Sequence, residues 1–128
     1  MDKKMELALK KFDASYMNNT KWKKLWEALT NELGEVHFFY KLVYGEKITQ
    51  SVLDSPDFAP YFIEPIIYKE VEWVVFPATY KDFVSQDNLK AGKKDYHQDI
   101  ERMEQIILSL GQFLLERSEG SLKLYAYR

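Results

Sequence analysis

The spacing of apolar residues predicts two helices in the first third of the chain. In residues 1–16 and 19–33 apolar side chains recur every three or four positions, which places them on one face of a helix. Residues 17–20 include types that favour N-caps, so the second helix is expected to begin near Asn19 or Thr20, and Gly34 can end it in a left-handed conformation. The two apolar stripes are Met5, Leu9, Phe12 and Tyr16 in the first helix, and Trp22, Leu25, Trp26, Leu29 and Leu33 in the second.

The apolar period then changes to two, which is typical of strands. Residues 35–44 are rich in aromatic and β-branched side chains, and Gly45 allows a turn into a short return strand over 48–52. A loop with two prolines over 54–60 leads to a further strand region over 61–76, broken at Pro65. We expect the core face of that region to carry Ile67, Val71, Trp73 and Val75.

The last third predicts a helix and a hairpin. Residues 77–94 favour one or two helical turns around Tyr80, Phe83 and Val84, followed by a loop. A helix is predicted over 93–110, ended by Gly111, and two strands over 112–116 and 122–127 flank a glycine-containing turn. The sequence therefore predicts an α+β fold, with a mostly antiparallel sheet, helices packed on one face and a closing C-terminal hairpin. We expect a single domain over residues 1–128, with 1–16 as a helical N-terminal extension and 17–128 as the α+β core.

Composition excludes several classes of protein. The 128 residues contain no cysteine, which removes thiolate catalysis, cysteine-based metal sites and a disulfide scaffold. The five glycines are isolated, so no phosphate-cradling loop is present. The longest apolar stretch, residues 73–78, is far shorter than the roughly 18 residues that suggest a membrane span. We expect a cytoplasmic protein with no membrane association.

The residues that could carry catalysis or bind metal form no convincing set. His97 and Glu101 stand four apart in the predicted third helix, near Asp95 and Asp99, which would permit an open metal site. The solvent-exposed face of an amphipathic helix explains the same pattern, and His37 on a strand is expected to be a half-buried histidine with its hydrogen bonds satisfied. We therefore predict no catalytic residue, no metal and no cofactor.

Charge is distributed unevenly, although the formal net charge is only −2. Residues 1–47 carry +2, residues 48–88 carry −5 and residues 89–128 carry +1. The acidic middle segment favours a basic protein as partner and argues against nucleic acid, although acids of this kind also serve solubility alone. Two glutamates of this segment are expected to share a strand face with a tyrosine, where a contact role is favoured over acid–base catalysis. The candidate partner-binding residues are Asp54, Asp57, Tyr68, Glu70 and Glu72.

Three segments resemble a family of small uncharacterised bacterial cytosolic proteins known as a domain of unknown function. They are Asn18-Asn-Thr-Lys-Trp-Lys-Lys-Leu25 at a helix start, Tyr68-Lys-Glu-Val-Glu-Trp-Val-Val-Phe-Pro77 on a strand, and Leu122-Lys-Leu-Tyr-Ala-Tyr-Arg128 at the C-terminus. The resemblance covers about residues 17–128. It implies no activity, cofactor or site residue.

Three functional hypotheses follow from the sequence. The favoured one is a non-catalytic protein-binding protein, of immunity or regulatory type, that masks a basic partner with its acidic central surface. The second is a small-ligand-binding domain or enzyme with a pocket between helices and sheet, containing His37, Glu70 or Glu72. The third is an oligomeric structural module, in which Met5, Leu9 and Phe12 of the N-terminal helix associate with another copy.

Overall fold

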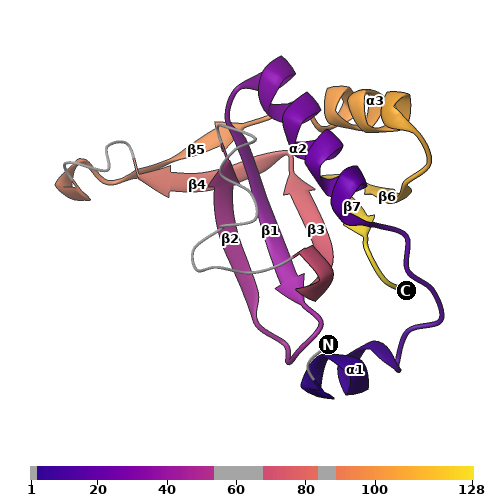
Figure 1. Cartoon of the computed structure of the whole chain (residues 1–128). Helices are drawn as coiled ribbons and strands as arrows, with labels where there is room; N and C mark the ends of the chain where they lie inside the picture. Colours follow the sequence, from indigo (N-terminus) through magenta and orange to yellow (C-terminus); the bar gives the residue numbers. More distant parts are fainter. Residues whose placement is uncertain (1–2, 54–67, 84–88) are drawn as a thin grey trace.

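The computed structural model describes residues 3–53, 68–83 and 89–128 (Figure 1). Three α-helices and seven strands make up this part of the chain, together with two short 3-10 turns. The helices are α1 (Lys3–Leu9), α2 (Asn19–Leu33) and α3 (Ile100–Leu110). The strands are β1 (Val36–Leu42), β2 (Ile48–Leu53), β3 (Val71–Pro77), β4 (Thr79–Phe83), β5 (Lys93–His97), β6 (Leu114–Ser118) and β7 (Ser121–Tyr125), and the 3-10 turns are η2 (Tyr68–Glu70) and η3 (Leu89–Ala91).

The strands form one antiparallel sheet and a separate two-stranded ribbon. Five strands follow the order β2-β1-β3-β7-β6, and each neighbouring pair is antiparallel. The C-terminal hairpin of β6 and β7 joins the sheet through β3, so the predicted α+β fold with a closing hairpin is confirmed. Strands β4 and β5 pair with each other and extend away from the body of the molecule (Figure 1).

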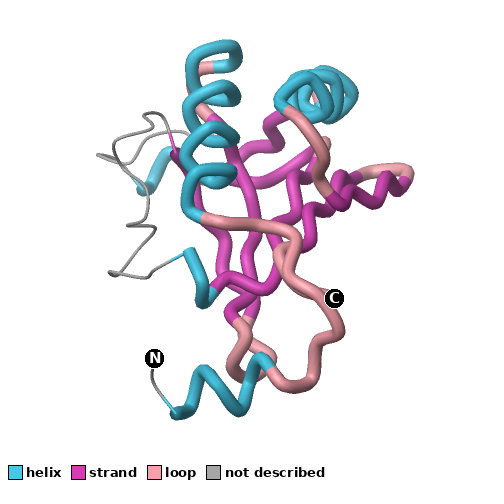
Figure 2. Tube along the Cα trace, turned by 45° about the vertical axis from the view of Figure 1, so that its right-hand side comes forward, coloured by secondary structure: helices cyan, strands magenta, loops and turns pink. Residues whose placement is uncertain are grey.

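The core lies between the sheet and the helices α2 and α3, and α1 lies apart from them near the end of β1 (Figures 1 and 2). The predicted start and end of α2 are confirmed: the helix begins at Asn19, where the side chain of Asn18 caps it, and Gly34 ends it with φ of +76°. Every residue of the predicted α2 stripe is in the core cluster or packs against it. From the sheet, the fully buried core residues include Val36, Phe38, Val71, Val74, Phe76, Leu122 and Leu124.

The predicted core face of β3 is wrong in part, because the strand contains a bulge. Between Lys41 and Leu42 the register with β1 shifts, leaving Glu72 as an extra residue on β3. The bulge changes the alternation, so Val71, Val74 and Phe76 face the core. Trp73 and Val75 lie on the other face of the sheet, opposite Lys41 and Phe39 of β1. Ile67, the remaining residue of the predicted face, lies outside the described residues.

The predictions for residues 79–83 and 93–99 are also wrong, and residues 84–88 lie outside the described part of the chain. Instead of helical turns around Tyr80, the chain forms β4, and residues 93–97 form β5 rather than the start of the third helix. Helix α3 begins only after Asp99, whose carboxylate accepts a hydrogen bond from the Arg102 amide at 3.0 Å. The ribbon is held by tertiary contacts that local periodicity does not contain: Tyr80 stacks on both Tyr96 and His37. The side-chain amide of Gln98, which follows β5, also links the ribbon to the sheet. It accepts from the His37 amide and donates to the carbonyls of His37 and Pro77.

The N-terminal helix is shorter than predicted. Helix α1 ends at Leu9, and the chain then runs alongside the C-terminus, with a β-bridge between Ser15 and Tyr127. Hydrogen bonds to the C-terminal main chain replace the helical hydrogen bonds that residues 10–16 would otherwise make. Of the predicted stripe, Met5 is buried, Leu9 and Phe12 are half-buried, and Tyr16 is exposed.

Candidate binding pocket

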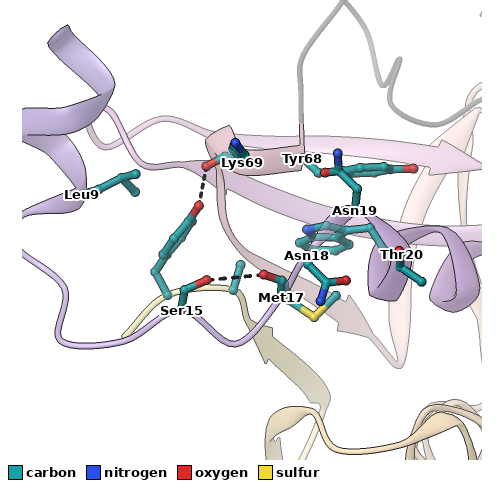
Figure 3. A pocket seen from close by; sticks show the side chains of 11 residues that line it. Leu9, Ser15, Met17, Asn18, Asn19, Thr20, Tyr68 and Lys69 are labelled. Atoms are coloured by element: carbon teal, nitrogen blue, oxygen red, sulfur yellow. Dashed lines mark hydrogen bonds between the residues drawn. The ribbon is translucent and has the colours of Figure 1, made fainter. Parts of the chain in front are cut away.

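A pocket of about 540 Å³ lies at the N-terminal end of α2 (Figure 3). Its walls come from four segments: the chain before α2, the first turns of α2, the turn η2, and the two residues that follow β7. The side chain of Asn18 accepts a hydrogen bond from the Lys21 amide at 2.8 Å, which fixes where the helix begins and therefore where the pocket's edge lies. The lining residues are Leu9, Ser15, Met17, Asn18, Asn19, Thr20, Trp22, Tyr68, Lys69, Ala126 and Tyr127.

The deep wall of the pocket is aromatic. Trp22 and Tyr68 stack with their ring centroids 5.6 Å apart, and Trp22 also stacks on Trp26 at 6.1 Å. This row of rings continues the core along α2 to the pocket, so buried core residues lie behind the wall. Met17, Leu9 and Ala126 complete the apolar lining. Such a wall favours an apolar or aromatic group as occupant.

The rim of the pocket is polar. In Figure 3, Leu9 faces Tyr68 and Asn19 across the opening, with Lys69 on one side and Ser15 and Met17 on the other. Ser15, Asn19, Thr20 and Lys69 are exposed. The Tyr127 hydroxyl donates a hydrogen bond to the Lys69 carbonyl at 2.9 Å, and the Ser15 hydroxyl donates one to the Met17 carbonyl at 3.3 Å. An apolar floor within a polar rim is the usual arrangement of a protein–protein contact site.

Both tyrosines of the pocket remain protonated well above neutral pH. Burial raises the pKa of Tyr68 to about 12, because the phenolate would lose its hydration there. Burial raises the pKa of Tyr127 for the same reason. With Lys69, these phenols are the ionisable side chains among the described lining residues. The pocket can therefore supply hydroxyl groups for hydrogen bonds, whereas the described lining has no pair of groups suited to transferring a proton near pH 7.

The structure describes three of the five predicted partner-binding residues, Tyr68, Glu70 and Glu72. Tyr68 is 6% exposed and forms part of the pocket wall, and Glu70 ends the same turn, half-buried. The carboxylate of Glu72 lies 2.7 Å from the Lys41 ammonium on the sheet, so the expectation that Glu70, Glu72 and Tyr68 share one strand face is wrong. Asp54 and Asp57 lie outside the described residues. A role of these five residues in binding stays a prediction.

Neither histidine belongs to a metal site in the described part of the chain. His37 is 4% exposed, more deeply buried than predicted, and its Nε2 lies 2.8 Å from a Glu35 oxygen. His97 lies on β5 rather than on a helix, and its Nδ1 is 3.3 Å from the Thr79 hydroxyl. Among residues 3–53, 68–83 and 89–128, no group of three His, Asp or Glu side chains could hold a metal ion. Within the same ranges, no helix is long and apolar enough to cross a membrane.

Most of the pocket could not be predicted from the sequence. The apolar pattern predicts Trp22 as a core residue, and Tyr68 is a predicted contact residue, but nothing in the pattern predicts that residues 15–17 and 126–127 lie next to them. The missing information is long-range main-chain pairing: residues 13–16 hydrogen-bond to residues 126–128, and the amides of Ala126 and Tyr127 donate to the Glu72 carbonyl at 2.9 and 3.3 Å. The one local signal was the Asn18-Asn-Thr20 run at the start of a tryptophan-bearing helix, which lines the pocket's edge.

Comparison with known proteins gives one result. No curated protein and no solved structure significantly matches the chain. Residues 5–127 match the sequence pattern of a family of unknown function (DUF6678). The match begins at residue 5, so most of the segment predicted to be an N-terminal extension lies within the family's own sequence pattern. Because nearly the whole chain matches, the protein belongs to this family of unknown function.

Proposed function

We propose that the protein is a non-catalytic binding protein whose pocket at the start of α2 receives an apolar side chain of a protein partner. The observation that carries this proposal is the pocket itself: an aromatic wall of Trp22 and Tyr68, about 540 Å³ of space, and an exposed polar rim. Its volume lies within the range of small-ligand sites. The exposed rim favours a protein, because polar residues around a deep apolar anchor point are what a partner's surface contacts.

The described lining residues support binding rather than chemistry. Two phenols of raised pKa and one lysine provide hydrogen bonds and charge, and the pocket wall holds no described carboxylate or imidazole. A protein that masks a partner by receiving one of its side chains acts as a regulator or inhibitor, the role that the sequence favoured. The proposal does not depend on the partner being basic; that expectation rests on the charge of residues 48–88, of which the described residues Tyr68 and Lys69 line the pocket.

The experiment is a titration with N-acetyl-tryptophanamide, a single aromatic side chain with capped main chain, followed by amide chemical shifts. We expect saturable shifts at residues 17–22, 68–69 and 126–127 in the millimolar range, and none from N-acetyl-alaninamide. T20W places an indole at the exposed pocket edge and should remove the shifts. The matched control K23W adds the same indole to an exposed position of α2 that does not line the pocket, and should bind normally.

The class of occupant is decided by selection from a random peptide library. We expect enriched peptides to share one large apolar residue, to compete with N-acetyl-tryptophanamide, and to lose binding to T20W but not to K23W. Peptides that bind both variants equally would contradict the site. If the amide binds but no peptide is enriched, the protein-partner assignment is wrong and a small molecule is the occupant.

A further inference from the structure

The pocket is built where the two ends of the chain meet. The amides of Asp13 and Ala14 both donate to the Arg128 carbonyl, at 3.0 and 3.1 Å, and the Arg128 amide donates back to the Ala14 carbonyl at 3.1 Å. The Tyr16 amide donates to the Ala126 carbonyl at 2.8 Å. These hydrogen bonds bring Ser15 and Met17, which precede α2, beside Ala126 and Tyr127, which follow β7. We call residues 3–17 the N-terminal arm.

Side chains attach the arm at points that do not line the pocket. The Lys11 ammonium donates to the Val43 carbonyl at 3.0 Å, and the Phe12 ring packs against Tyr127 with centroids 5.5 Å apart. Met5 is the buried residue of α1, and the Lys4 ammonium lies 4.8 Å from the centre of the Tyr44 ring. Phe12 therefore positions Tyr127, a lining residue, without belonging to the lining itself.

The arm is attached less firmly than the helices of the core. Helix α1 has seven residues, too short to be stable alone, and one of them is buried. Most other side chains of the arm are exposed or half-buried. Segments with few buried apolar contacts are those that open locally at low free energy. The docked position of the arm is therefore a state that additional contacts can stabilise.

An occupant of the pocket supplies such contacts. Leu9, Ser15 and Met17 come from the arm, whereas Trp22, Tyr68 and Lys69 come from the rest of the fold, so an occupant touches both sides. We propose that docking of the arm and occupation of the pocket stabilise each other, which makes the arm a coupled part of the binding site. This inference rests on the proposed function. Coupling of this kind is reciprocal: the occupant protects the arm, and weakening the arm's attachment lowers affinity for the occupant.

Hydrogen exchange tests the first half of this reciprocity in the full-length protein. With saturating N-acetyl-tryptophanamide, the amides of Asp13, Ala14, Tyr16 and Arg128 should exchange several-fold more slowly, while amides in the middle of α3 should not change. Unchanged exchange of the arm amides at saturation would overturn the coupling and leave the binding site intact. Failure of the probe to bind at all would overturn both proposals, so the two failures are distinguishable.

A substitution outside the pocket tests the second half. F12A removes the ring that packs on Tyr127 and should weaken binding of N-acetyl-tryptophanamide by about five- to tenfold. K10A changes an exposed neighbour in the arm and should keep the affinity within about twofold of the unmodified protein, the scatter expected for a surface change. Retained α3 exchange protection in F12A would show that the fold is intact. Equal affinity of F12A and the unmodified protein would contradict the inference.

Discussion

The start of helix α2 and the rest of the helix carry the same kind of residue in different surroundings; we call residues 19–22 the open end and residues 25–33 the filled end. Toward the middle of the helix, Leu25, Trp26 and Leu29 are 0% exposed, and the Trp26 ring lies 4.8 Å from Phe38 and 6.1 Å from Phe76, measured between centroids. At the start of the helix Trp22 is equally buried, yet it borders a pocket of about 540 Å³. The sheet fills the space beside Trp26, whereas chain ends and a 3-10 turn only partly enclose the space beside Trp22.

This difference shows that one apolar stripe can serve both stability and recognition. The stripe predicts which face of α2 is buried, but the elements opposite each residue determine whether that burial leaves space. Regular strands interdigitate with the helix at close-packed density. At the pocket, main-chain hydrogen bonds between residues 13–16 and 126–128 hold the walls apart, so space remains beside Trp22.

Removing a large ring from the filled end should cost the most stability. W26A deletes a side chain packed on all sides, and we expect the free energy of unfolding to fall by about 3–5 kcal/mol. M17A removes a half-buried side chain at the pocket and should cost about 1 kcal/mol. Urea unfolding followed by circular dichroism measures both. Equal losses would show that Met17 at the pocket contributes as much to stability as Trp26 in the core, which would contradict the difference in packing.

Alkaline pH should destabilise the open end specifically. The folded state raises the pKa of Tyr68 to about 12 from an ordinary value of 10.0, so the folded protein holds this proton more tightly than the unfolded chain does. The resulting stability is fully present below pH 10 and is lost as pH rises toward 12. Between pH 9 and pH 11.5 we expect the unmodified protein to lose on the order of 2 kcal/mol more than Y68F. Parallel pH profiles for the two proteins would contradict this assignment.

Removing the cap of α2 should have a moderate effect that is largest at the open end. N18A takes away the acceptor for the Lys21 amide and should cost about 1 kcal/mol. N18D retains an acceptor at the helix start and should restore most of that loss. Amide exchange should rise in residues 19–22 but not in residues 25–33. A uniform rise along the helix would mean that its two ends are equally anchored.

Filling the pocket edge should barely change stability. T20W and K23W both add an indole at exposed positions of α2, so each should stay within about 0.5 kcal/mol of the unmodified protein. They should differ in binding, since only position 20 lines the pocket. Thermal unfolding provides the comparison. A large loss of stability in T20W would show that the pocket does not accept a ring at its edge.

Local patterns in the sequence predicted the elements that depend on local interactions. The apolar stripe of α2, its cap region and Gly34, and the C-terminal hairpin all involve residues close together in the chain. The predicted helix over residues 93–97 was wrong because Tyr96 continues the apolar spacing of α3, while its actual partner is Tyr80 on β4. The bulge at Glu72 was not predicted for a similar reason: the Glu72 carboxylate pairs with Lys41, 31 residues away in the chain.

The pocket depends on interactions that are longer in range than any of these. Residues 13–16 hydrogen-bond to residues 126–128, at the other end of the sequence. The periodicity of apolar residues reports on neighbours a few positions apart and does not predict this pairing. The sequence predicts Tyr68 as a contact residue from a strand face shared with Glu70 and Glu72, which the structure does not have, and the space beside Tyr68 follows only from the fold.

The central claim, that the pocket at the start of α2 is the binding site, is tested most directly by intermolecular nuclear Overhauser effects. With N-acetyl-tryptophanamide bound, the indole protons should show contacts to the methyl groups of Leu9, Met17 and Ala126, which line the pocket. Ile48, Val52 and Leu108 are exposed apolar residues elsewhere on the surface and serve as internal controls. Contacts confined to the pocket methyls would agree with the account, and contacts to the control methyls, with none in the pocket, would contradict it.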